Sequence, residues 1–331
     1  MLEDIFIPKS SVDAARVSPL HTVTIITSDK EQLERIFCEG YKLEFSGWKS
    51  CSDTCVSQYL LLDTNNTFEF GLFYLSAPHN NIQIRVLAHN EDSGPIRPST
   101  TGLHLGGATL SFPIEDLYEH EKTMRSLEIS STMGVKEMEF TSPTGETYIS
   151  AEIVYPVADN VFVMGVKRPD IFIPVGPVKE RTKIGAAAYS SRCIQHTEKT
   201  LKFFQDILGY EIRRDVEFVV GEQSALNMPE GTNERFIQGF APGSASGYVV
   251  LMDHKDGNIP AADDNYLPPK RGIVMWSFET SDLDAIVSQA EEIGVEVLKT
   301  PDKYGSPGLP SSRSAILKDP DGFAIEVFES V

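Results

Sequence analysis

Two polar residues in otherwise apolar segments are the strongest candidates for chemistry. Glu326 lies within Phe-Ala-Ile-Glu-Val-Phe at 323–328, and Tyr189 lies in the small, largely apolar segment 184–194. A carboxyl group held among apolar side chains has a raised pKa, which suits it to proton transfer near neutral pH. A tyrosine hydroxyl can orient a substrate or donate a hydrogen bond to an enolate. We therefore predict Glu326 and Tyr189 as the catalytic residues.

Other familiar catalytic patterns are missing from the sequence. It contains no Gly-rich phosphate loop, no Ser-His-Asp arrangement and no dinucleotide-binding fingerprint. Cys51 and Cys55 are spaced C-x3-C, but no second cysteine pair or histidine couple follows, which disfavours a zinc site. We expect the four cysteines of the chain to be reduced thiols.

Composition and charge narrow the class of partner. The 331 residues carry a formal net charge of −19, which repels nucleic acids and anionic membrane surfaces. No apolar run is long enough to span a bilayer. The N-terminal segment 1–8 is acidic and ends in a proline, unlike a signal peptide. These features predict a cytoplasmic protein with a small-molecule substrate and with neither a nucleic acid nor a membrane as partner.

The chain contains an internal repeat. Asp-Ile-Phe-Ile-Pro occurs at 4–8 and again at 170–174, and the Glu-Asp-Leu of 115–117 is echoed by the Ser-Asp-Leu of 281–283. Both pairs have the same offset of 166 residues, from position 4 to 170 and from 116 to 282. A shared offset predicts two copies of one domain, at 1–165 and 166–331.

Each predicted domain divides again into two similar units. Small apolar segments predict first strands, and apolar residues at helical spacing predict the helices that follow them. The first strands and helices of the four units are predicted at 22–27 and 30–38, 108–112 and 116–127, 184–194 and 197–208, and 273–278 and 283–293. Three further strands complete each unit. The sequence thus predicts an α+β fold of four βαβββ modules with outer helices.

Two stretches resemble the vicinal oxygen chelate superfamily, which includes glyoxalases, extradiol dioxygenases and bleomycin-resistance proteins. They are Thr-Leu-Lys-Phe-Phe-Gln-Asp-Ile-Leu-Gly-Tyr at 200–210 and Lys-Asp-Pro-Asp-Gly-Phe-Ala-Ile-Glu-Val-Phe at 318–328. The resemblance implies two tandem domains with curved, cup-like mixed sheets. In this superfamily two modules close into a cup, and a divalent metal is held there by residues of the first and last strands.

The metal ligands of the superfamily are only partly represented here. The resemblance puts Glu326 at the position of the carboxylate ligand, while Tyr189 and Met275 occupy the positions of the two histidines. Tyrosine, methionine and glutamate do not form an ordinary site for a hard divalent metal. The resemblance therefore implies either no cofactor or an unidentified divalent metal, iron or manganese, with Glu326 or His21 as its ligand.

Strand alternation predicts what else would line the cup of residues 166–331. Successive side chains of a strand point to opposite faces, so residues spaced by two share the face of the ligand positions. A largely apolar cup with one carboxylate suits a small aromatic or apolar ligand. The predicted substrate-binding residues on these strands are Ser191, Met275, Ser277 and Phe328.

Two long irregular segments are predicted to cover this site. Residues 254–271 join the third and fourth units, and residues 302–313 interrupt the fourth unit with a run rich in Gly, Pro and Ser. Loops of this length are often binding loops. We predict that His254, Tyr304 and Arg313 of these segments contact the substrate.

Three functions remain open on this reading. The first is an enzyme that acts by isomerase, lyase or C–C cleavage chemistry on a small apolar molecule with a carbonyl, enol or aromatic group. The second is a metal-dependent dioxygenase or glyoxalase-like lyase, and the third is a noncatalytic binding protein of the bleomycin-resistance type. Fold resemblance alone does not separate them. The resemblance also leaves a homodimer open, although four modules suffice to close two cups within one chain.

Overall fold

The computed structural model describes residues 16–62, 67–77, 82–88, 93–141, 147–169, 175–222, 224–255, 266–302 and 306–330. The two pentapeptides that revealed the repeat, at 4–8 and 170–174, lie outside the described residues. No helix of the described segments is long and apolar enough to cross a membrane.

The predicted βαβββ order is confirmed in modules 2, 3 and 4, and module 1 follows it with one change. In each module a first strand leads into an outer helix, and the following strands return to pair beside the first strand. Module 1 differs because its second strand is replaced by two short strands and a helix. Its elements are β1 (Thr22–Thr27), α2 (Lys30–Arg35) with a π-helical turn at Ile36–Gly40, β2 (Glu44–Phe45), β3 (Lys49–Cys51), α3 (Thr54–Tyr59), β4 (Phe68–Tyr74) and β5 (Gln83–Ala88).

The other modules follow the simpler pattern. Module 2 comprises β6 (Gly106–Pro113), α4 (Leu117–Ser126), β7 (Lys136–Thr141), β8 (Thr147–Pro156) and β9 (Phe162–Lys167). Module 3 comprises β10 (Tyr189–Ile194), α5 (Thr197–Lys202) with a π-helical turn at Phe203–Ile207, β11 (Glu211–Val219), β12 (Asn233–Phe240) and β13 (Tyr248–His254). Module 4 comprises β14 (Gly272–Glu279), α6 (Leu283–Glu292), β15 (Glu296–Asp302), β16 (Ser311–Lys318) and β17 (Ala324–Ser330).

Aspartate caps start three of the four module helices. The side chains of Asp29, Asp116 and Asp282 accept hydrogen bonds from backbone N–H groups in the first turns of α2, α4 and α6. Such caps satisfy backbone donors that have no partner within the helix. Because each cap directly follows a first strand, it fixes where the chain leaves the sheet. Residues of equivalent position in the modules can therefore be counted from these caps.

The first strands pair across the two halves of the chain. β1 of module 1 runs antiparallel to β14 of module 4, and β6 of module 2 runs antiparallel to β10 of module 3. In every module the last strand lies parallel to the first. One curved sheet therefore combines modules 1 and 4, and another combines modules 2 and 3. This differs from the expectation that the two modules of one half would close a cup together, and the boundary at 165/166 stays a prediction from the repeat.

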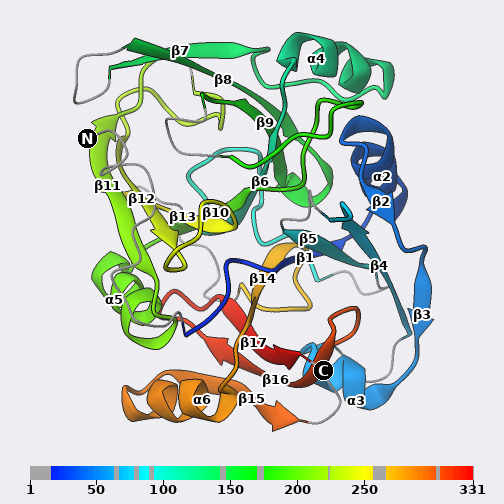
Figure 1. Cartoon of the computed structure of the whole chain (residues 1–331), viewed down its shortest axis with the longest axis vertical. Coiled ribbons are helices and arrows are strands. Elements are labelled where there is room, and N and C mark those ends of the chain that lie inside the picture. Colours follow the sequence, from blue (N-terminus) through cyan, green and yellow to red (C-terminus); the bar gives the residue numbers. More distant parts are fainter. Residues whose placement is uncertain are drawn as a thin grey trace.

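The two curved sheets meet where β14 touches β6, with Ile273 opposite Gly107. A Cβ atom on Gly107 would lie only 2.4 Å from the backbone oxygen of Ile273. No side chain fits this approach, so glycine is required at this junction. Figure 1 shows the first strands β1, β14, β6 and β10 near the centre and the helices α2, α4, α5 and α6 at the periphery.

The core has an outer and an inner part. The outer part lies between the helices and the sheets and includes the fully buried Trp276, whose indole N–H donates to Ser190 Oγ at 3.0 Å. A buried ion pair of Arg192 and Asp319 also lies here, with the guanidinium 4.8 Å from the ring centre of Phe323. Asp319 belongs to the Asp-Pro-Asp-Gly hairpin, so this motif anchors module 4 to module 3. The inner part lies on the concave faces of the sheets and holds the candidate sites.

Candidate functional site

Glu326 lies at the centre of the cup formed by modules 1 and 4. Its carboxylate accepts hydrogen bonds from Tyr59 Oη at 3.0 Å, Ser277 Oγ at 2.6 Å and Arg85 Nη2 at 2.9 Å. The side chains of Arg85 and Glu326 are both fully inaccessible to solvent. All the donors around Glu326 come from the protein itself, so the structure shows a buried ion pair here.

Arg85 is held from several further directions. Its Nε donates to Thr24 Oγ1 at 3.0 Å, and its Nη1 donates to the backbone oxygen of Pro307 at 3.1 Å and to Ser306 Oγ. Its Nη2 also lies 3.5 Å from Met275 Sδ. Counted from the helix caps, Arg85 occupies in module 1 the place that Glu326 occupies in module 4: Arg85 pairs with Thr24, and Glu326 with Ser277. The two opposite charges of this ion pair therefore come from equivalent last strands.

Tyr189 and Ser191 lie in the other cup, between modules 2 and 3. The Ser191 hydroxyl is 2.6 Å from Thr109 Oγ1 of β6, and the Tyr189 ring stacks on Tyr248 of β13 with ring centres 4.7 Å apart. The prediction that Tyr189 and Glu326 face one common hollow is thus corrected. The physical reason is strand pairing: Tyr189 is carried by β10, which joins β6, while Glu326 is carried by β17 beside β14, which joins β1.

The remaining predicted residues lie in the cup of modules 1 and 4, at its edge or at the surface. Met275 and Ser277 line the cup of modules 1 and 4 beside Glu326, and we call this the closed cup. Phe328 is buried against the ring of His21, with ring centres 5.1 Å apart. Arg313 lies at the surface, where it pairs with Asp284 and with Glu329. Tyr304 lies outside the described residues.

The cup of modules 2 and 3 contains a cavity of about 610 Å³. Most of its lining is apolar, with side chains from β7, β8, β9, β10, β11, β12 and β13 and from the loop that follows β11. A cavity of this size fits a small organic molecule. The apolar lining includes Met138, Met164, Val216, Phe218, Phe236, Val250 and Met252, and the charged lining consists of Lys136, Glu152, Arg168, Arg214, Glu217 and Glu234.

Glu234 is a buried acid in the wall of this cavity, with 4% of its surface exposed. Burial raises its pKa to about 7, which is near neutral pH. Its Oε2 lies 4.0 Å from Nδ1 of His254, the last residue of β13, and the other ring nitrogen of His254 faces the Gly102 carbonyl oxygen at 3.3 Å. Burial lowers the pKa of His254, so the neutral ring is favoured. The predicted loop residue His254 is thus a buried strand residue that stands behind Glu234.

Arg168, just after the end of β9, brings a positive charge to the opposite side of the cavity. Its Nη1 donates to Tyr248 Oη at 3.3 Å and its Nη2 to Tyr189 Oη at 3.5 Å. Burial raises the pKa of the nearby Glu152, and the positive charges of Arg168 and Lys136 lower it by less, so the pKa is raised overall. The predicted catalytic Tyr189 therefore lies beside a cation rather than beside Glu326.

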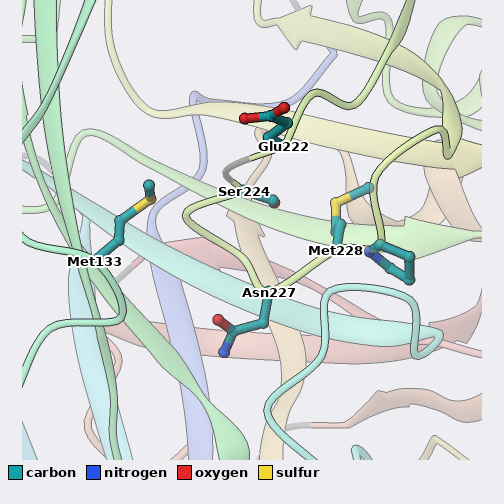
Figure 2. A pocket seen from close by; sticks show the side chains of 6 residues that line it. Met133, Glu222, Ser224, Asn227 and Met228 are labelled. Carbon is teal, nitrogen blue, oxygen red and sulfur yellow. The ribbon is translucent and has the colours of Figure 1, made fainter.

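A loop covers one side of this cavity. Residues 224–229 of this loop also border a second hollow of about 420 Å³, where Met133 and Met228 lie on either side (Figure 2). The Asn227 side chain donates to the Thr100 carbonyl at 3.0 Å, and Thr132 Oγ1 donates to the Ala225 carbonyl at 2.8 Å. Segments before β6 and before β7 therefore hold this loop in place.

The residues at the expected ligand positions do not fit a divalent metal. In the closed cup the arginine guanidinium faces the carboxylate that would be the ligand, and a fixed positive charge opposes a metal cation. In the cup of modules 2 and 3, the corresponding strand positions are occupied by Thr109, Met164, Tyr189 and Val250. Nowhere in the described segments do three His, Cys, Asp or Glu side chains gather in a way that could hold a metal ion. His21 packs on Phe328 instead, and burial lowers its pKa.

Comparison with known proteins gives one family match and several solved structures of similar fold. Residues 187–327 match the model of the Glyoxalase/Bleomycin resistance protein/Dioxygenase superfamily. Glyoxalase I from Zea mays is 13% identical, with a TM-score of 0.59 over 94% of this chain and 92% of that chain. A putative dioxygenase from Bacillus subtilis subsp. subtilis str. 168 is 11% identical, with a TM-score of 0.56 over 96% and 86%. A search of curated proteins finds no match.

Residues 187–327 therefore match this superfamily, and nearly all of the chain has the fold of these two solved structures. At such low identity the solved structures show the fold alone.

The sequence reasoning missed Arg85, Arg168 and Glu234. A usable signal for Arg85 was present, because it interrupts the apolar run Ile-Arg-Val-Leu just as Glu326 interrupts its own strand. Arg168 follows a strand end and Glu234 lies in a polar stretch, so neither has a comparable signal. Their role depends on which strands pair.

Proposed function

We propose that the protein is an enzyme that binds a small, largely apolar molecule in the cup of modules 2 and 3 and transfers a proton on it through Glu234. The observation that carries the proposal is the cavity of about 610 Å³, which is mostly apolar and has Glu234 in its wall. The closed cup does not compete for this role because its centre is filled by the pair of Arg85 and Glu326. We therefore propose Glu234 on β12, rather than Glu326 on β17, as the catalytic carboxyl group.

The proton chemistry follows from the state of Glu234. A general base works best when its pKa is close to the working pH, and a pKa of about 7 meets this condition. The carboxylate would take a proton from a carbon next to a carbonyl group and return it to another atom of the same molecule. Such a transfer is an isomerisation, and loss of a leaving group from the enolate would make it a lyase reaction. Tyr189 and Arg168 line the same cavity and would bind another part of the molecule.

Deuterium exchange provides a direct test. In D₂O, a panel of aromatic ketones and enols would be followed by proton NMR with the wild-type protein and with Glu234→Gln. We expect the wild type to accelerate exchange at the carbon next to the carbonyl, and the variant to lose at least about a hundredfold of that acceleration. Glu198→Gln is the matched control, because Glu198 is an exposed residue paired with Arg235 on the outer helix side.

Calorimetric titration of the same compounds would separate enzyme from binder. The proposal requires that Glu234→Gln still binds a compound whose exchange it no longer accelerates. Tight binding without any accelerated exchange in the wild type would assign the noncatalytic binding function instead. Exchange that survives the substitution would remove Glu234 from its role. The cytoplasmic location, the absence of nucleic-acid and membrane partners and the homodimer remain predictions.

A further inference from the structure

Two arginines line the cavity of modules 2 and 3 without a carboxylate partner. The guanidinium groups of Arg168 and Arg214 have no carboxylate oxygen within 4.0 Å among the described residues. Several other arginines do form ion pairs, namely Arg85, Arg125, Arg192, Arg213, Arg235, Arg271 and Arg313.

The two cations are fixed by uncharged groups. Arg168 contacts the hydroxyl groups of Tyr189 and Tyr248, and its guanidinium carbon lies 5.7 Å from the centre of the Tyr189 ring. Arg214 lies over the ring of Phe236, 5.5 Å from its centre. Such contacts orient a guanidinium without supplying a carboxylate partner. Burial, followed by the charge of Arg168, lowers the pKa of Arg214, which shows that the two cations oppose each other.

A buried amide next to Arg214 adds an independent sign of a missing partner. Gln238 pairs with Arg214 across β11 and β12 and is 1% exposed, yet neither its amide nitrogen nor its amide oxygen has a hydrogen-bond partner. It shares its strand face with Phe236 and Glu234, which both line the cavity. Buried polar atoms in proteins are almost always satisfied. An acidic group between the arginines would accept a hydrogen bond from this amide.

We infer that the molecule bound in this cup carries a carboxylate, held between Arg168 and Arg214 at the tyrosine side of the cavity. The inference rests on the proposed function only in that it uses the same cavity. Arginine matches a carboxylate with two parallel hydrogen bonds, and the low-dielectric wall strengthens them. The ligand class is therefore an apolar or aromatic carboxylic acid.

The acids of the cavity leave room for such a group. Glu234 lies four residues from Gln238 along β12, which places the two about 13 Å apart along the strand. Glu152 acts on Arg168 through its charge, but no oxygen of it lies within 4.0 Å of that guanidinium. The ligand would thus extend from the arginines, along the apolar wall, toward Glu234.

The test uses a matched series of probes. Calorimetric titration would compare 2-naphthoate, its neutral amide 2-naphthamide and 2-naphthyl phosphate with the wild-type protein. We expect naphthoate to bind at least about tenfold more tightly than the amide, which corresponds to about 1.4 kcal/mol. Arg168→Gln and Arg214→Gln should each remove about tenfold of naphthoate affinity and leave amide binding nearly unchanged. Arg235→Gln, at the outer side of the same sheet, is the control.

Each other outcome has a defined meaning. Equal binding of naphthoate and naphthamide would overturn the carboxylate inference and leave the cavity as the binding site. Preference for the phosphate by tenfold would also overturn it, in favour of a phosphorylated ligand. If none of the probes binds, both this inference and the proposed binding cup fail. Arg168→Lys should keep part of the preference for naphthoate over naphthamide. If this variant loses the whole preference and also has a lowered melting temperature, Arg168 is a structural residue and the inference is contradicted.

Discussion

Arg85 Nη2 and Glu326 Oε2 meet at 2.9 Å in the interior of the protein, although the two residues belong to the first and last modules of the chain. Other protein groups complete the environment of the pair, namely Tyr59, Ser277, Thr24, Ser306, the Pro307 carbonyl and Met275. A pair of this kind is costly to bury but far more costly to break, because the remaining charge loses its partner. The ion pair therefore links module 1 to module 4, and we call this link the joint between the two modules.

Breaking this joint should destabilise the protein strongly. For Glu326→Gln and for Arg85→Met we expect a loss of about 3–5 kcal/mol in the free energy of unfolding, because each leaves one buried group uncompensated. Urea unfolding followed by circular dichroism measures the change. The double variant with Arg85→Met and Glu326→Leu should recover much of the loss. As a control, Arg313→Gln breaks a surface pair and should cost about 1 kcal/mol or less. A mild effect of Glu326→Gln would contradict the assignment of a joint.

Glu234 should make stability depend on pH. Its pKa in the folded protein is raised to about 7 from an ordinary value of 4.5, so the folded state binds the proton more tightly than the unfolded state. The contribution is fully present below pH 4.5 and is lost as the pH rises through 7, with an upper bound of roughly 3 kcal/mol. Comparison of unfolding free energies at pH 5 and pH 8 for wild type and Glu234→Gln measures it.

The neighbouring histidine must be separated from this effect. Burial lowers the pKa of His254, which lies 4.0 Å from Glu234, so its contribution changes with pH in the opposite sense. The variant His254→Asn should therefore steepen the decline of stability only below the ordinary histidine pKa of 6.5 and leave the decline above it unchanged. A Glu234→Gln protein with an unaltered pH profile would show that Glu234 ionises as an ordinary surface acid.

The junction of the two curved sheets should not tolerate a side chain. In Gly107→Ala the added methyl group would lie 2.4 Å from the Ile273 backbone oxygen, so we expect a loss of about 1–3 kcal/mol or more from the forced shift. Thermal unfolding provides the measurement. Gly221→Ala is the control, because nothing lies within 4 Å of its added atom. Equal melting temperatures for both variants would argue against close contact of the sheets.

The cysteines should differ in reactivity. Burial raises the pKa of Cys193 to about 12, and its Sγ donates to the Gly102 carbonyl at 2.9 Å, whereas Cys55 is exposed. Thiolates, not thiols, react with disulfide reagents. We therefore expect Ellman's reagent to label Cys55 quickly in the native protein and Cys193 only in urea, as read by mass spectrometry of peptides. Rapid native labelling of Cys193 would show that the segment around Gly102 opens readily.

The sequence was a good guide to the fold because the fold depends on local patterns. The alternation around Tyr189 and Met275 and the helical spacing after each first strand predicted the order of the elements. Each of these inferences needs only neighbours along the chain. Tyr189 and Ser191 lie in one cup, whereas Ser277 and Glu326 lie in another, so the predicted common cup is not found.

The site could not be predicted in the same way because it depends on distant pairing. Whether β14 joins β10 or β1 decides whether Glu326 meets Tyr189 or Arg85, and no local pattern carries that choice. Glu326 is therefore held in an ion pair with Arg85 in place of facing an apolar hollow. Burial raises the pKa of Glu234, and only the assembled sheet provides that burial.

The pairing of β1 with β14 also affects how the chain is made. During synthesis the inner modules 2 and 3 emerge one after the other and can join through β6 and β10 at once. Module 1 emerges before them, but the strand that completes its sheet comes after residue 271. The concave face of module 1 therefore stays uncovered for most of the translation time. We expect a chaperone or a ribosome-bound factor to act on this part of the nascent chain.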